Sequence, residues 1–462
     1  MPCGAVKCRQ KERHGTLAIG RAGAIGKGAL RAEKEATNGS TPAAAQARLL
    51  FAVTLGNALE WLDFSAFALF AVFIARDFFP AESELASLLA VFATFAAGFV
   101  MRPVGALVLG SYADRAGRRA ALSLTILLMA AGTAVIAFTP GYAAIGAAAP
   151  VLIVLARMLQ GLSAGGEIGG AVAFLVEHAP DGMRGRYASW QQAGQAGAFL
   201  LAGLSGHLVT NLLTPAQVQA FGWRLPFVFG LAIAPVGLYI RWKLDETPLF
   251  DRYRRQRLSR GAAPVGELFR AHRRALAIGI ALVAAGAVCN HLANYMPTYL
   301  IRELKMKLSS AYIGLFVFGC ALSIAPLIGA WCDRVGRVPL MRASAAGMLI
   351  LAYPSFWVLN RWPGETTLVL VQLVLGLLLV VYAVPGYAVG AGLFPTRVRG
   401  TGLAVIYSVG VTVFGSLTPM VGTVLVELTG DRTAVAWWFI AAALISLAAL
   451  TLLDDGASEK MD

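Results

Sequence analysis

Five ionisable residues lie inside long apolar stretches of the sequence: Glu60, Asp63, Arg102, Arg157 and Glu167. A charge at membrane depth is costly to bury, so such residues are expected to face a cavity or a partner and to have a function. Glu60 and Asp63 are three positions apart and share one face of a helix. We expect one of these carboxylates to bind and release a coupling proton and the other to pair with an arginine. A static ion pair that holds neighbouring spans together is the alternative.

Further polar residues are candidates to contact a substrate. Arg102 precedes the polar turn at Gly110 by eight residues, which places it about 12 Å from the membrane edge and near the midplane. Arg157 and Gln160 share a helix face and suit an anionic substrate or an acidic partner. The predicted substrate-binding residues are Arg102, Arg157, Arg224, Gln160, Gln192, Asn290, Asn294 and Tyr382. The predicted proton-coupling residues are Glu60, Asp63 and Glu167.

Some of these candidates have a simpler interpretation. Arg224 begins an apolar stretch, where an arginine also snorkels to the membrane interface. Asn290, Asn294 and Tyr382 are uncharged, and hydrogen bonds between helices are the alternative to substrate contact. The charged candidates are concentrated in the first half of the chain, so the two halves are expected to contribute differently.

A polar turn between apolar stretches occurs twice. Asp114–Arg119 reads Asp-Arg-Ala-Gly-Arg-Arg, and Asp333–Arg337 reads Asp-Arg-Val-Gly-Arg. A second pair, Pro180-x-x-x-Arg-Gly and Pro395-x-x-x-Arg-Gly, recurs at nearly the same offset. Two repeated markers indicate a duplicated half. The predicted gating residues, which would cap or latch neighbouring helix ends, are Asp114, Arg115, Arg118, Asp333, Arg334 and Arg337. Charge that only sets membrane topology is the alternative.

The composition indicates a membrane protein. Of 462 residues, 58% are hydrophobic and only 14% are charged, whereas a soluble chain has about a quarter charged residues. The net charge of +14 is distributed between apolar stretches, as the positive-inside rule predicts, so we expect no nucleic-acid partner. The five cysteines have no metal-ligand spacing, and we expect no metal and no cofactor. The sequence contains none of the common catalytic motifs, and we expect no enzyme activity.

Twelve stretches are long enough to span a bilayer as helices. They lie near 50–76, 87–110, 120–139, 149–176, 187–212, 223–244, 275–300, 310–331, 340–359, 367–394, 402–426 and 434–453. The predicted fold is therefore an all-α integral membrane protein with two six-helix bundles, at 49–245 and 275–454. A basic linker (246–274) joins the bundles, and a disordered basic tail (1–48) and a short tail (455–462) flank them. The arginine-rich loops fall on one side, which places both termini in the cytoplasm.

Six segments together resemble the metabolite:proton symporters of the major facilitator superfamily. These segments are Gly56–Phe64, Met101–Gly105, Asp114–Arg119, Arg157–Glu167, Gly222–Phe227 and Glu246–Pro248. The resemblance implies a twelve-helix fold and proton-driven uptake across a bacterial inner membrane. It also associates the arginines at positions 102 and 224 with carboxylate substrates.

Other segments look most like citrate and tricarballylate symporters, namely Phe78–Glu84, Pro140–Gly146, Ser189–Gln192 and Leu417–Asp431. The resemblance thus implies a symporter of protons and a di- or tricarboxylate such as citrate. We expect it to lie in the lipid bilayer and to act as a monomer. Two alternatives stay open. One is a symporter for an osmolyte such as proline or betaine, which the absence of heptads after the last apolar stretch disfavours. The other is a membrane scaffold or sensor, which has no need for intramembrane charges.

Overall fold

The computed structural model describes residues 42–116, 118–165, 171–172, 175–176, 179, 182–243, 265–395 and 398–453. The predicted tails, apart from 42–48, and the predicted linker up to residue 264 lie outside these ranges. The chain divides into two units, Met1–Phe51 and Ala52–Asp462, and the second unit contains both predicted bundles almost entirely.

The described residues form helices and contain no strand, as expected for backbone that must satisfy its own hydrogen bonds in lipid. The first half contains α2 (Pro42–Leu69), α3 (Ala71–Phe78), α4 (Glu84–Ala116), α5 (Arg118–Phe138), α6 (Tyr142–Ile145), α7 (Ala148–Gly165), α9 (Arg184–Leu212), α10 (Pro215–Ala220), η1 (Gly222–Arg224) and α11 (Leu225–Lys243). The second half contains α13 (Val265–Ala271), α14 (Arg273–Arg302), α15 (Leu308–Leu322), α16 (Ala325–Val335), α17 (Arg337–Arg361), α18 (Glu365–Gly392), α19 (Arg399–Gly410), η2 (Val411–Ser416), α20 (Thr418–Thr429), η3 (Arg432–Ala434) and α21 (Val435–Thr451).

Each predicted span coincides with one or more of these helices. Seven described helices are long and apolar enough to cross a membrane, and two bent pairs raise the number to nine. The bends are 68° between α2 and α3 and 42° between α15 and α16. Helix α9 is not among the nine; it carries Gln191, Gln192 and Gln195, which lowers its hydropathy. These findings are consistent with twelve spans.

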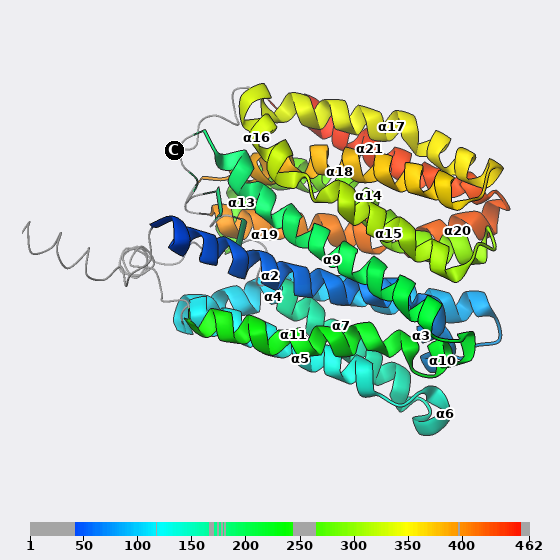
Figure 1. Ribbon diagram of the computed structural model, residues 1–462. Helices are drawn as coiled ribbons and strands as arrows, with labels where there is room; N and C mark the ends of the chain where they lie inside the picture. Colours follow the sequence, from blue (N-terminus) through cyan, green and yellow to red (C-terminus); the bar gives the residue numbers. More distant parts are fainter. Residues whose placement is uncertain are drawn as a thin grey trace, which may run out of the picture. The chain divides into compact units, whose positions relative to one another are not determined.

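The helices pack in two groups that meet along α9. Helices α4, α5 and α7 contact one another, and α11 packs against α5. In the second group, α14 and α17 each pack against both α18 and α21. Helix α9 packs against α15 and α16 of the second group, and Figure 1 shows it running between the two. We call the end at which α9 begins and α16 terminates the basic end. The acidic end is the opposite one, where α3 ends and α4 begins.

A crossing of glycines brings α4 and α7 into backbone contact. A Cβ atom added to Gly161 would lie 1.6 Å from the carbonyl oxygen of Gly98, and one added to Gly165 would lie 1.9 Å from that of Arg102. Side chains would hold these helices apart, whereas glycine permits close packing in membranes. The crossing therefore places Arg102 of α4 and Arg157 of α7 on one closely packed helix pair.

The second copy of the repeated turn is as tight as the sequence predicts. Gly336 separates α16 from α17 with a φ of 99°, a conformation that favours glycine. In the first copy, Gly117 and the side chains of Asp114, Arg115 and Arg118 lie outside the described part of the chain.

Candidate functional site

A cavity lies where the two groups of helices meet, and polar side chains from both line it. Its polar lining includes Gln192 and Gln195 of α9, Asn290 and His291 of α14, Tyr382 and Tyr387 of α18, Tyr407 of α19 and Trp61 of α2. None of the described lining residues carries a full charge at neutral pH, unless His291 is protonated. We call this space the central cavity.

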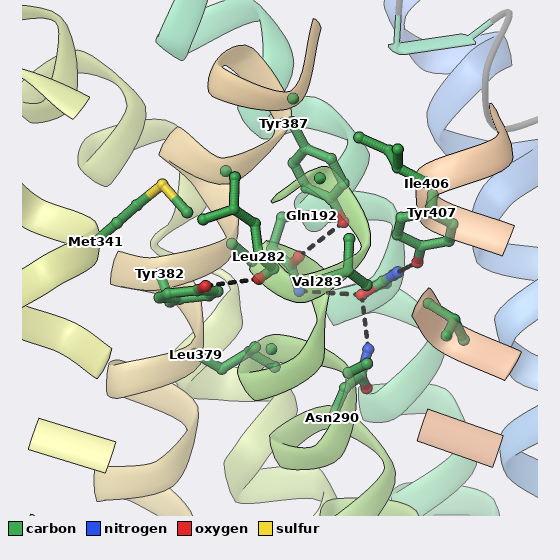
Figure 2. Close-up of a pocket in the computed structure, with 18 of the residues that line it drawn as sticks. Gln192, Leu282, Val283, Asn290, Met341, Leu379, Tyr382, Tyr387, Ile406 and Tyr407 are labelled. Atoms are coloured by element: carbon green, nitrogen blue, oxygen red, sulfur yellow. Dashed lines mark hydrogen bonds between the residues drawn. The ribbon is translucent and has the colours of Figure 1, made fainter. Parts of the chain in front are cut away.

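Hydrogen bonds join the two halves across the central cavity (Figure 2). Gln195 is the hub of the network. Its Oε1 accepts from Gln192 Nε2 at 3.1 Å and from Asn290 Nδ2 at 3.2 Å, and its Nε2 donates to the Tyr407 hydroxyl at 3.3 Å. The Tyr387 hydroxyl donates to Gln192 Oε1 at 3.2 Å. The bonds therefore link α9 of the first half to α14, α18 and α19 of the second.

Tyr382 is bonded differently. Its hydroxyl donates to the backbone oxygen of Leu282 at 2.6 Å, between α18 and α14 of the same half. This bond is of the interhelical type, which the sequence left as an alternative to substrate contact. The Tyr382 ring nevertheless lines the cavity.

Two buried ion pairs lie within the first half. Arg102 Nη2 is 2.8 Å from Glu60 Oε1, and Arg157 Nη1 is 2.9 Å from Asp63 Oδ2. The four side chains are 0–5% exposed, so water screens neither pair. Glu60 and Asp63, three residues apart on α2, thus each hold one arginine, from α4 and α7 respectively.

Asp63 accepts a hydrogen bond from a second side chain in addition to Arg157. The Thr133 hydroxyl lies 2.8 Å from Asp63 Oδ1, and Gln160 Nε2 donates to the Thr133 oxygen at 3.0 Å. Arg157 Nη2 also donates to the Asp63 backbone oxygen at 3.3 Å. Gln160 therefore orients Thr133, through which it supports Asp63.

Both acids line a second cavity inside the first half. Its lining includes Glu60, Asp63, Thr125, Thr133, Ser163 and Phe227. The carboxylates thus border a space that is distinct from the central cavity, and neither Arg102 nor Arg157 lines it.

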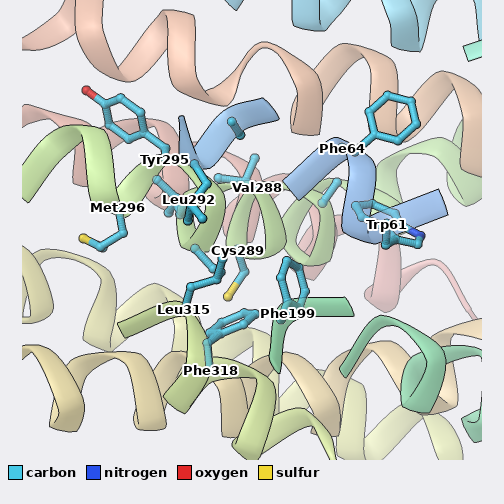
Figure 3. Close-up of a cluster of buried hydrophobic side chains, with 14 of the residues drawn as sticks. Trp61, Phe64, Phe199, Val288, Cys289, Leu292, Tyr295, Met296, Leu315 and Phe318 are labelled. Atoms are coloured by element: carbon cyan, nitrogen blue, oxygen red, sulfur yellow. The ribbon is translucent and has the colours of Figure 1, made fainter. Parts of the chain in front are cut away.

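Aromatic rings surround the Arg102 guanidinium, and one of them, Trp61, also lines the central cavity. The guanidinium carbon lies 4.3 Å from the Phe99 ring centroid, 4.8 Å from that of Phe64 and 5.5 Å from that of Trp61. Figure 3 shows Trp61 and Phe64 on α2 beside the apolar cluster of α14 and α15. Cation–π contacts stabilise a guanidinium that has left water. Arg102 Nε is buried and has no hydrogen-bond partner among the described residues.

Arg224 lies at the acidic end and lines neither cavity. Its Nη2 is 2.9 Å from Asp77 Oδ2 and 3.1 Å from the backbone oxygen of Thr139, and the guanidinium carbon lies 4.1 Å from the Trp223 ring centroid. The pair Arg224–Asp77 ties η1 to α3 and to the end of α5.

At the basic end, Asp333 caps a helix of the other half. Its Oδ1 accepts from the backbone N–H of Gly185 at 2.8 Å, and its Oδ2 accepts from that of Arg186 at 3.0 Å. Both amides belong to the first turn of α9, where a carboxylate satisfies free donors and the positive end of the dipole. Arg337 Nη2 lies 3.8 Å from Asp333, and Arg334 is exposed.

The chain is similar to known transport proteins along most of its length. A family model described as Major Facilitator Superfamily matches residues 53–359. The chain belongs to the major facilitator superfamily. A citrate-proton symporter of Salmonella typhi is 40% identical over 89% of this chain and 96% of its own length. A putative proline/betaine transporter of Staphylococcus aureus (strain COL) is 31% identical over 88% of each chain.

The fold is also that of a solved major facilitator structure. The xylose transporter XylE from E. coli superposes with a TM-score of 0.69 at 17% identity, covering 88% of this chain and 96% of that one. The resemblance inferred from the six segments is confirmed, and so is the fold class. These relatives are transporters, and the chain is a transporter rather than an enzyme.

The structure brings together only part of the predicted site of this major facilitator. Gln192, Asn290 and Tyr382 line the central cavity, whereas Asn294 lies one turn further along α14 and donates to the Asn290 backbone oxygen at 3.5 Å. Arg102, Arg157 and Gln160 are buried in the first half and do not line this cavity, and Arg224 lies at the acidic end. Glu167 lies outside the described residues. The roles given to these residues remain predictions.

Gln195, Tyr407 and Trp61 were missed by sequence reasoning. One signal was available for Gln195: it follows Gln192 by three residues and so lies on the same helix face. Trp61 and Tyr407 look like ordinary apolar or interfacial residues in sequence. Their place in the cavity depends on contacts between distant helices.

Proposed function

We propose that this chain is a proton-coupled symporter that imports a small organic acid, most simply a di- or tricarboxylate such as citrate. The 40% identity to a citrate-proton symporter over nearly its whole length supports the substrate class. The observation that carries the coupling is the pairing of Glu60 with Arg102, whose guanidinium lies against the Trp61 ring of the central cavity.

The coupling follows from the cost of leaving a buried charge without a partner. Protonation of Glu60 alone would take the carboxylate from Arg102, and an anion reaching Arg102 alone would place two carboxylates beside one guanidinium. Breaking one side of a buried pair costs about 3–5 kcal/mol. When both events occur together, the guanidinium exchanges one carboxylate for another and the net buried charge is conserved. Proton and substrate therefore enter together or not at all.

Asp63 of α2 and Arg157 of α7 would serve the same cycle. Asp63 accepts from both Thr133 and Arg157, and the second bond holds the Arg157 guanidinium beside it. We assign Glu60 the proton that exchanges in each cycle and Asp63 the role of keeping Arg157 in place. In the alternative assignment, Asp63 carries the exchanging proton and Glu60 keeps its arginine in place. Measurements of citrate uptake by the Glu60→Gln and Asp63→Asn variants distinguish the two assignments.

The orientation and the gate belong to the same proposal. The arginine-rich loops at the basic end indicate the cytoplasmic side, with both termini there and a bacterial inner membrane as the location. The contact of Asp333 with α9 would close the cytoplasmic end in one state and break when the halves rock apart. The protein would act as a monomer, because substrate and proton sites lie within one chain.

An osmolyte symporter is the second candidate. The central cavity is lined by Trp61, Tyr382, Tyr387 and Tyr407 and by no fixed charge among the described residues, which suits a zwitterion or a quaternary ammonium group. The 31% identity to a putative proline/betaine transporter is lower than the 40% identity to the citrate-proton symporter, which favours the organic acid.

Uptake of labelled citrate and of labelled proline into proteoliposomes, with and without an imposed proton gradient, tests both candidates. We expect citrate to accumulate only with the gradient. Proline accumulation without citrate accumulation would replace the substrate class and keep the coupling. Equal citrate uptake with and without the proton gradient would contradict symport.

A further inference from the structure

Three polar atoms of residues that line the central cavity have no protein partner. They are Trp61 Nε1, His291 Nε2 and Asn290 Oδ1, each buried and without a hydrogen bond among the described residues. Trp61 is 1% exposed and His291 is fully buried. A buried polar atom left without a partner destabilises the fold by about 1–3 kcal/mol, so a ligand that satisfies it gains that energy.

The hydrogen-bond roles of these atoms are fixed. His291 Nδ1 lies 2.8 Å from the backbone oxygen of Ala287, which can only accept, so Nδ1 bears the proton. Nε2 of the neutral ring is therefore an acceptor, whereas Trp61 Nε1 is a donor only. The two rings lie edge to face with centroids 5.9 Å apart. A donor from α2 and an acceptor from α14 thus flank the same part of the cavity.

The imidazole is held rigidly. The centroids of Phe99 and Phe95 lie 5.2 and 6.0 Å from it. On another side it packs against Gly415 of the π-helix η2, where an added Cβ would lie 2.7 Å from Nδ1. π-Helical turns occur frequently at functional sites, and here the turn leaves room for the ring.

A donor beside an acceptor is complementary to a protonated carboxyl group. Such a group presents a carbonyl oxygen that accepts and an O–H that donates, whereas a carboxylate presents acceptors only. We propose that Trp61 and His291 bind a protonated carboxyl group of the substrate: Trp61 Nε1–H donates to its carbonyl oxygen, and its O–H donates to His291 Nε2. This assignment rests on the proposed function.

The surroundings of the pair agree with a neutral group. The charged residues that face it among the described elements are Arg102 of α4, which lies against the Trp61 and Phe99 rings, and its partner Glu60 of α2. Helices α18 and α19 contribute tyrosines, and α9 contributes amides. One carboxylate of the substrate can reach toward Arg102 while the protonated one lies against His291. The substrate itself then carries one proton, in addition to the proton on Glu60.

Binding of citrate to the purified full-length protein at several pH values tests the assignment. The slope of log Kd against pH, with Kd expressed for total citrate, counts the protons taken up on binding. We expect His291→Phe to lower this slope by about one. His291→Gln keeps an acceptor oxygen and should keep the slope. His272→Phe makes the same chemical change outside both cavities and serves as the control.

Two outcomes would overturn the assignment. An unchanged slope in His291→Phe would remove the protonated carboxyl from this position, and a slope lowered equally by His291→Gln would place the proton on the imidazole itself. Trp61→Phe gives an independent reading if His291→Phe does not fold: we expect about tenfold weaker citrate binding, and a change below about twofold would contradict the proposal. A wild-type protein that binds no di- or tricarboxylate would instead refute the proposed function.

Discussion

The carboxylate of Asp333 lies 2.8 Å from the backbone nitrogen of Gly185, although the two residues belong to different halves of the chain. The repeated turn therefore reaches across the interface and contacts the first turn of α9. A charge at this position stabilises the helix end by about 0.3–1 kcal/mol, and by up to about 2 kcal/mol when partly buried.

Asp333→Asn should loosen the basic end of the transporter. The substitution keeps one acceptor and removes the charge, so we expect a several-fold increase in labelling of a cysteine introduced beside Gly185. Asp431→Asn is the matched control, because Asp431 accepts from Thr433 N–H at 2.8 Å at the start of η3 within a single half. Equal labelling in Asp333→Asn and wild type would refute the latch.

Arg102→Met should abolish citrate uptake and destabilise the protein, because Glu60 is left buried without its partner; the expected loss is about 3–5 kcal/mol. The double variant Arg102→Met/Glu60→Leu removes both charges and should recover much of the thermal stability in detergent. It should not recover uptake. Uptake by the double variant would exclude Arg102 from the substrate site.

The variants Glu60→Gln and Asp63→Asn should show which of the two acids binds the coupling proton. A fixed neutral side chain cannot release a proton, so the variant at the coupling site should lose gradient-driven accumulation and retain exchange of internal for external citrate. We expect this result for Glu60→Gln, with exchange that depends less on pH than in the wild type. Asp63→Asn should reduce both activities, because Arg157 loses its partner. If both variants still accumulate citrate, the proton binds elsewhere.

Arg224→Gln should destabilise the packing at the acidic end of the protein without weakening substrate binding. The Arg224 guanidinium is 2.9 Å from Asp77 Oδ2, and it lines neither cavity. We expect lower thermal stability with less than about a twofold change in the KM for citrate, and partial repair by Asp77→Asn. A KM raised about tenfold or more at normal stability would restore the substrate role that the family resemblance implies.

Gly161→Ala should prevent proper packing of α4 on α7. The new methyl group would lie 1.6 Å from the carbonyl oxygen of Gly98, and the helices must separate at a cost of about 3 kcal/mol or more. Gly197→Ala is the control, since no atom lies within 4 Å of its added Cβ. The measurement is the yield of monodisperse protein and its unfolding temperature; equal values for the two variants would contradict the tight crossing.

The sequence predicted the features that depend on one helix at a time. Apolar length located the spans, the spacing of Glu60 and Asp63 located two acids on one face, and the repeated turn located Gly336. These signals are local and follow from helix geometry. The partners of the acids were predicted only as a class, because either arginine satisfied the same reasoning.

The features that depend on two distant helices were not predictable in this way. Gln195 and Tyr407 are separated by 212 positions and meet only because α9 packs against the second half. Arg224 was assigned to the substrate by family resemblance, and nothing in the sequence links it to Asp77, which lies at the end of α3. His291 Nε2 has no hydrogen-bond partner among the described residues because none of its neighbours places a donor beside it. The sequence of α14 alone cannot predict this, because those neighbours belong to other helices.

The glycine crossing of α4 and α7 has an electrical consequence. Because the two backbones are in contact, Arg102 and Arg157 must travel together when the halves rock. Each arginine is paired with an acid of α2, so these charges cancel, and the charge that moves through the membrane field is that of the substrate and its protons. A rapid citrate jump on a supported membrane should therefore evoke a single transient current. Its amplitude would report the net charge of the substrate together with its protons.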